Sequence, residues 1–153
     1  MSDQPALPTL DDARQLLAAA DSLLAGALTR ARVLTQNGRA IDDHQVLAER
    51  VAYAATEARA ARELIEYAAG VRSEGRGDAW LEATAAAGAA ELVASLVARL
   101  TPAVDDLGIG DDALQASFPP ELRKKLRAAS NEAVFRAIGR EVAGRRGRNE
   151  TPL

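Results

Sequence analysis

The 153-residue sequence contains no cysteine, one histidine and one tryptophan, and aromatic residues make up only 3% of it. The absence of cysteine excludes disulfides, thiolate catalysis and cysteine-based zinc sites. Because β-branched and aromatic residues in alternating runs are also missing, no segment has the pattern of a β-strand. The sequence therefore predicts a helical protein with few residue types available for chemistry.

The chain also lacks the long apolar runs of membrane proteins. No apolar run approaches the ~20 residues that span a bilayer. The N-terminal stretch MSDQPALPTLDD is acidic and has no apolar centre, so it does not resemble a signal peptide. Hydrophobic residues at 48% and charged residues at 27% are typical of a globular protein. We expect a cytoplasmic protein with no membrane association.

Alanine-rich helical periodicity is what the sequence has in abundance. The spacing of apolar residues predicts four main helices, and the acidic connector before the last one has room for one short helix begun by Asp111 or Asp112. The fourth helix opens with two prolines, which a first helical turn tolerates. The four helices span Thr9 to about Gln36, Asp42 to about Ala69, Asp78 to about Leu100, and Pro120 to about Val142.

These helices predict the fold class all-α, with an antiparallel up-and-down four-helix bundle. We expect a flexible N-terminus over residues 1–8, a single helical-bundle domain over residues 9–143, and a disordered basic tail over residues 144–153.

The second helix has a narrow stripe of small residues, which lets a neighbouring backbone approach closely. Asn37 and Gly38 before it supply the left-handed residues that end the preceding helix. Asp42 and Gln45, three positions apart, predict a capping box at its start. The stripe consists of Leu47, Val51, Ala54, Ala58, Ala61, Ile65 and Ala68.

This corner and the helix after it resemble the C-terminal helical domain of the acyl-CoA dehydrogenase and acyl-CoA oxidase family. The resemblance is most specific from Gly38 to Ala69. It implies a helical bundle that self-associates and that, in the full enzymes, contacts FAD. The matching residues are Gly38, Ile41 and Gln45, then Leu47, Ala48, Ala52, Glu57, Ala60, Ala61, Glu63, Leu64 and Tyr67.

The chain departs from the family at the positions that the resemblance links to the flavin. An arginine of the family becomes Thr35, a phenylalanine becomes Asn37, and a glutamine before a glycine turn becomes Asp105. A carboxylate facing a pyrophosphate would repel it. We therefore expect no FAD binding unless a partner chain completes the site. The degenerate flavin-corner positions are Thr35, Asn37, Gly38, Gln45, Asp105, Gly108 and Gly110.

Residues able to bind a metal are few. His44, the only histidine, lies beside Asp42 and Asp43 at the start of the second helix, where it could serve as a metal ligand or general base. Consecutive helical residues point in different directions, so these three side chains do not close a metal shell. We interpret His44 as an exposed residue and expect no metal site.

Carboxylates are the other candidates for catalysis, because members of the resembling family place a catalytic carboxylate in this domain. The candidates are Glu57, Glu63 and Glu66 on the second helix and Asp21 on the first. Pairing of the three glutamates with Arg59 and Arg62 at helical spacing is the default interpretation. Nothing in the sequence around Asp21 marks it as special, and we expect no catalytic residue.

Basic residues gather towards the C-terminus. The first 120 residues hold ten Lys and Arg against eighteen Asp and Glu, whereas residues 121–153 hold nine against four. Such a cluster could contact the phosphates of a nucleic acid. Against this, the whole chain is acidic, and no aromatic side chains lie between the basic ones to stack on bases. An acidic protein, or the acidic face of a second copy, is the better-supported partner.

The last predicted helix carries apolar residues on more than one face, and monomers seldom leave such a surface in water. We expect a homo-oligomer, with a dimer as the simplest closed form. These residues are Leu122, Leu126, Val134, Phe135, Ile138 and Val142.

Two functions stay open at this point. The first is a stand-alone, non-catalytic bundle that acts by self-association or by docking to a partner protein. The second is an accessory subunit that pairs with a larger dehydrogenase-type chain and completes the flavin site of a two-chain acyl-CoA dehydrogenase.

Overall fold

The computed structural model describes residues 5–146, which form α-helices and short 3₁₀ turns without a strand. This confirms the all-α fold class. The α-helices are α1 (Leu10–Leu34), α2 (Gln45–Ser73), α3 (Ala79–Leu100), α4 (Gly110–Ser117), α5 (Pro120–Ala129) and α6 (Glu132–Gly144), and the 3₁₀ turns are η1 (Ile41–His44) and η2 (Thr101–Ala103). Residues 1–4 and 147–153, which include most of the expected basic tail, lie outside the described residues.

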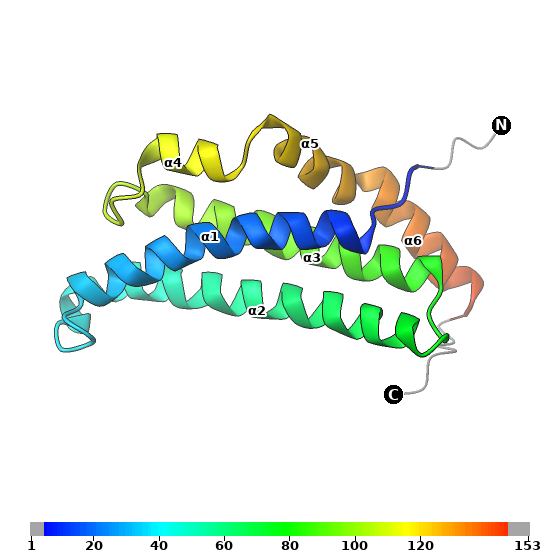
Figure 1. Ribbon diagram of the computed structural model, residues 1–153, viewed down its shortest axis with the longest axis horizontal. Helices are drawn as coiled ribbons and strands as arrows, with labels where there is room; N and C mark the ends of the chain where they lie inside the picture. The colour runs from blue at the N-terminus through cyan, green and yellow to red at the C-terminus, as the bar shows by residue number, and fades with distance from the viewer. Residues whose placement is uncertain (1–4, 147–153) are drawn as a thin grey trace.

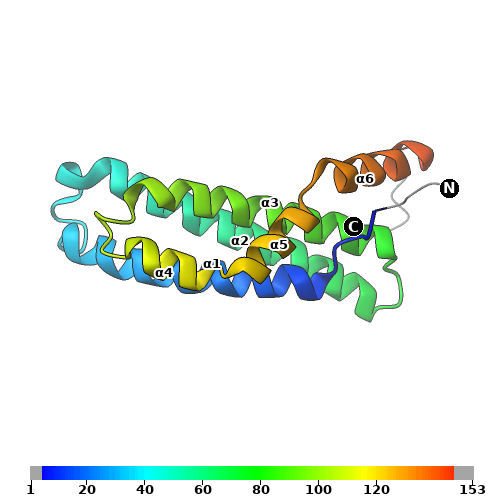
Figure 2. The same cartoon turned by 90° about the horizontal axis from the view of Figure 1, so that it is seen from above.

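Three long antiparallel helices form the body of the molecule (Figure 1). α1 and α2 meet at one end of the long axis, and α2 and α3 meet at the other. The hairpin of α2 and α3 is the most extensively packed pair of helices. Seen from above, α4 and α5 lie over α1 and α3, while α6 turns away beyond the start of α3 (Figure 2).

Alanines supply much of the core where α1, α2 and α3 meet. The stripe expected on α2 is buried from Val51 to Ala68, whereas Leu47 at its start is only half-buried. Val51, Ala54, Ala58 and Ala61 each have at most 3% of their surface exposed. Larger side chains fill the space that the alanines leave, because α1 and α3 contribute leucines to the same cluster. The largest fully buried side chains are Leu16, Leu96, Leu100, Val93 and Val134.

The fourth side of the bundle differs from the expectation of one long last helix. α5 ends at Ala129, and α6 begins again after Ser130 and Asn131. The Asn131 side chain caps α6 by accepting a hydrogen bond from the Val134 N–H at 3.0 Å. The Ser130 hydroxyl donates to the Leu126 carbonyl at 2.7 Å. The expectation of a continuous helix was wrong because these two polar side chains bond to the backbone at the break.

The other helices follow the expectation closely. α1 is capped by Thr9, whose hydroxyl oxygen accepts from the Asp12 N–H, and α3 is capped by Asp78, which accepts from the Leu81 N–H. The acidic connector holds the expected short helix, α4. The three long helices are therefore confirmed, whereas α4, α5 and α6 share the side that one fourth helix was expected to fill.

One helix within the described residues is long and apolar enough to span a bilayer. The segment is Ala79–Ala103, which comprises α3 and the turn η2, and its mean hydropathy is 1.4. The expectation that no segment approaches such a length was wrong by this measure, because alanine and leucine dominate α3 with only a few charges between them. In the structure α3 is the central helix, against which α1, α2, α5 and α6 all pack, and core helices share this composition.

Candidate functional site

The turn between α1 and α2 is held by Thr35, the C-cap of α1. Its side chain is buried, donates a hydrogen bond to the Ala31 carbonyl at 2.8 Å and accepts one from the Gly38 N–H at 3.2 Å. Gln36, Asn37 and Gly38 follow with φ values of 49°, 58° and 95°. This confirms the left-handed helix end predicted at Asn37 and Gly38.

The capping box predicted for Asp42 and Gln45 was wrong. The chain enters α2 through the 3₁₀ turn η1, and His44, which makes no side-chain cap, occupies the N-cap position. The Gln45 amide donates to the Asp42 carboxylate at 3.1 Å instead of to the backbone. The 3₁₀ turn takes up the backbone groups that a capping box would have satisfied.

A second turn, between η2 and α4, lies at the same end of the molecule. Gly108 and Gly110 have positive φ values of 60° and 70°, and the Gly108 N–H donates to the Asp105 carbonyl at 2.9 Å. Gly108 faces the side chain of Arg30 on α1. The fold therefore brings both expected flavin-corner segments, which are far apart in the sequence, to one end of the bundle.

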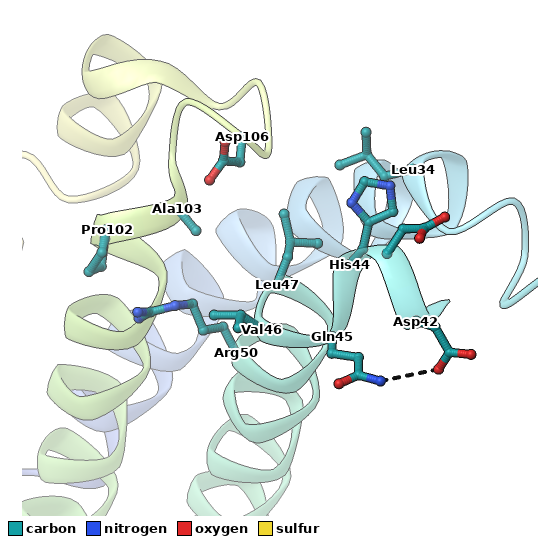
Figure 3. Close-up of a pocket in the computed structure, with 11 residues that line it drawn as sticks. Leu34, Asp42, His44, Gln45, Val46, Leu47, Arg50, Pro102, Ala103 and Asp106 are labelled. Carbon is teal, nitrogen blue, oxygen red and sulfur yellow. Dashed lines mark hydrogen bonds between the residues drawn. The ribbon is translucent and has the colours of Figure 1, made fainter. Parts of the chain in front are cut away.

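A groove of about 590 Å³ lies between these segments (Figure 3). Apolar side chains from α1, α2 and η2 line part of it, and charged side chains surround them. The lining residues are Leu34, Asp42, Asp43, His44, Gln45, Val46, Leu47, Arg50, Pro102, Ala103 and Asp106.

Charge in the groove is mixed, with an excess of carboxylates. Asp42, Asp43 and Asp106 line it together with one arginine, Arg50, whose guanidinium donates to the Arg99 carbonyl at 3.1 Å. Arg50 forms no ion pair with a carboxylate of residues 5–146. Such a groove would repel a pyrophosphate more than it would attract one.

Only one of the seven flavin-corner positions lines the groove. That residue is Gln45, whereas Thr35 is buried beneath the corner and Asp105 is exposed outside the groove lining. The carboxylate at the groove is Asp106, one residue later than expected. Arg50 was also missed, because its place on the groove depends on how η2 approaches α2, and no spacing within α2 encodes that approach.

A second polar cluster ties α2 to α3. The Glu57 carboxylate accepts hydrogen bonds from Ser95 Oγ at 2.6 Å and from Arg99 Nη2 at 2.6 Å, and the Arg99 guanidinium lies 5.0 Å from the centre of the Tyr53 ring. Burial by itself raises the pKa of Glu57, but the hydrogen bonds from Arg99 and Ser95 outweigh it and hold the pKa below its ordinary value.

Two of the other candidate carboxylates, Glu63 and Asp21, form ion pairs. Glu63 pairs with Arg59 along α2 as expected, and both side chains are largely exposed. Arg62 instead reaches Asp21 on α1 at 2.5 Å. The expectation that all three glutamates pair along α2 was therefore wrong for Glu57, which bonds across to α3, and for Glu66, which forms no ion pair with another residue of 5–146. Glu57 and Asp21 hold helices together. No group of three or more potential ligands among residues 5–146 is placed to hold a metal ion.

The fold now places an alanine-packed helical hairpin after a glycine corner, as the resemblance implied. The family model described as acyl-CoA dehydrogenase, C-terminal domain, matches residues 8–103. The chain belongs to this family. No curated protein and no solved structure gives a significant match to the chain.

The family match covers α1, α2, α3 and η2 and ends at Ala103. The first corner, with Thr35, Asn37, Gly38 and Gln45, lies within it. The glycine turn with Asp105, Gly108 and Gly110 lies beyond the matched residues. The alignment of Asp105 with the glutamine of the acyl-CoA dehydrogenase family therefore stays a prediction.

Proposed function

We propose that this member of the acyl-CoA dehydrogenase C-terminal family acts as a non-catalytic bundle that self-associates. The observation that carries the proposal is apolar surface left uncovered by the fold. Among the described residues, eight large hydrophobic side chains are exposed: Val33, Ile41, Val46, Tyr53, Leu64, Tyr67, Phe135 and Val142. Association with a second copy, or with a partner protein, would remove this surface from water.

The corner chemistry supports a role without catalysis. The groove presents three aspartates and one arginine, and the carboxylates of Glu57 and Asp21 form ion pairs between helices. The short helices α4, α5 and α6 follow the three long helices and leave Phe135 and Val142 exposed on α6.

The oligomeric state of the purified protein tests this proposal. Sedimentation velocity at micromolar concentration in moderate salt is expected to show a species near twice the monomer mass of 16.1 kDa. If the protein is a monomer at every concentration, the self-association proposal is wrong, and only docking to a different protein is left.

The alternative function is that of an accessory subunit that completes the flavin site of a two-chain acyl-CoA dehydrogenase. The convergence of both corner segments at one groove favours it, since a partner chain could supply the missing cationic contacts there. A pull-down from the native cell that recovers a larger dehydrogenase-type chain carrying flavin absorbance would support this alternative over the first.

A further inference from the structure

Four of the exposed hydrophobic residues lie on α2 and form one line along it. Val46, Tyr53, Ala60 and Tyr67 follow one another at intervals of seven residues. Leu64 lies between Ala60 and Tyr67, and all of these except Ala60 are exposed large hydrophobic residues. Residues seven apart are almost in register after two helical turns, so the five share one face. We call these five residues the α2 outer stripe.

The α2 outer stripe is separate from the stripe that enters the core. Val46 is 66% exposed, Tyr53 52%, Tyr67 43% and Leu64 37%, whereas the core residues of α2 are almost fully buried. α2 forms the edge of the molecule opposite α4 and α5, so none of the short helices covers it (Figure 1).

The order of side chains along the stripe is nearly symmetric about Ala60. Tyr53 precedes Ala60 by seven residues and Tyr67 follows it by seven. A two-fold axis requires a surface that matches itself when reversed. With Ala60 on the axis, the Tyr53 ring of one copy faces the Tyr67 ring of the other, and the small central side chain lets the helices approach.

Arg50 favours an antiparallel arrangement over a parallel one. It lies ten residues before Ala60 and forms no ion pair with a carboxylate of residues 5–146. An antiparallel pair keeps the two Arg50 side chains at opposite ends of the interface, whereas a parallel pair would place them against each other.

We propose that the α2 outer stripe is the two-fold interface between two copies of this chain, with the α2 helices antiparallel and crossing at Ala60. The inference rests on the self-association proposed above and names its surface. The stripe spans the 22 residues from Val46 to Tyr67, roughly 32 Å of helix. With the adjoining edge of α3 it would bury on the order of 600 Å² per copy, which is at the small end for a specific dimer. Dissociation in the micromolar range is therefore expected.

The absence of cysteine from the chain allows a direct test of the axis. A residue on a two-fold axis meets its own copy, so Ala60→Cys is expected to form a disulfide-linked dimer under mild oxidation. Ala52→Cys is the matched control, since Ala52 is exposed on the same helix but lies off the stripe. It is expected to stay unlinked under the same conditions.

A second pair of variants tests the interface in solution. Ala60→Glu would place two carboxylates against each other at the axis, and it is expected to weaken the dimer about tenfold or more. Ala52→Glu should leave the dissociation constant unchanged, and circular dichroism of both variants checks that the helices remain folded.

The outcomes separate this inference from the function on which it rests. A dimer that resists Ala60→Glu but dissociates on Phe135→Lys would overturn the α2 interface and place self-association on α6. A wild-type chain that is monomeric throughout would overturn both. Cross-linking of Ala60→Cys and Ala52→Cys to equal extent would also contradict the proposed axis.

Discussion

Small side chains at the contacts between α2 and its neighbours set how closely these helices approach. Ala58 is 2% exposed, and Ala54 and Ala61 on either side of it are fully buried. On the α3 side, a methyl group added at Gly88 would lie 3.1 Å from Leu64 Cδ1. Protein interiors pack densely, so a larger side chain at Ala54, Ala58 or Ala61 requires movement of the helices, whereas at Gly88 the Leu64 side chain would have to shift.

Replacing Ala58 by leucine should overpack this contact. We expect the variant to lose about 1–3 kcal/mol of unfolding free energy, since the surrounding helices must shift to accept the added atoms. Urea denaturation measures the change. Ala52→Leu, at an exposed position on the same helix, is the control and should have little effect. Equal stability of the two variants would mean that α2 does not pack as described.

The carboxylate of Glu57 should make stability depend on pH. Its pKa in the folded protein lies below the ordinary 4.5, so its contribution is fully present above that pH and is lost as the pH falls through the folded pKa. We expect Glu57→Gln to cost about 1–2 kcal/mol near neutral pH, because charge-assisted hydrogen bonds are lost at a partly exposed site.

Thermal melts of both proteins from neutral to acid pH measure this effect. The difference in Tm between wild type and Glu57→Gln should shrink at acid pH, where the native carboxylate is itself protonated. Some acid sensitivity should remain in the variant, since the pKa of Asp12 is lowered mainly by its hydrogen bond with Lys125. A constant difference in Tm would contradict the assignment.

At the scale of elements, apolar periodicity predicted where α1, α2 and α3 lie and could not predict where the last helix breaks. Leu122, Leu126 and Ala129 continue in phase towards Ala133, so the pattern indicates one helix through residue 130. The break depends on Ser130 and Asn131, whose side chains bond to the backbone in preference to continuing the helix. An asparagine followed by Glu132 is a helix-start signal that could have indicated it.

Removing this cap should destabilise α6 more than the rest of the protein. We expect Asn131→Ala to cost about 1 kcal/mol and to speed hydrogen exchange of the first amides of α6, while α2 stays protected. Asn131→Asp retains the acceptor and should exchange like the wild type. Uniform acceleration across all helices would show that α6 opens only with the whole molecule.

At the scale of the whole molecule, the sequence indicated that the two corner segments belong together, but not the groove that they form. The resemblance from Gly38 to Ala69 led to the family, and the family match confirms it. Spacing along the chain could not show that Asp106 faces the groove while Asp105 does not, or that Thr35 is buried. These facts depend on how η2 and α4 approach α1 and α2 in three dimensions.

The buried position of Thr35 supports the prediction that the protein does not bind FAD. We expect the protein to bind no FAD, and Thr35→Arg should not restore binding. The substitution would remove the hydrogen bonds to Ala31 and Gly38 and would place a charge in a buried site. Titration with FAD, followed by flavin fluorescence, measures this, and micromolar affinity in either protein would contradict the expectation.

The short loop between α2 and α3 has a consequence for how the chain acquires its structure. These two helices are consecutive in the sequence and form the most extensively packed pair. Closing the few residues between them costs little entropy, so their contacts can form early in folding. We expect α1 to dock on this hairpin afterwards. α4, α5 and α6, made last during synthesis, add to a surface that is already in place.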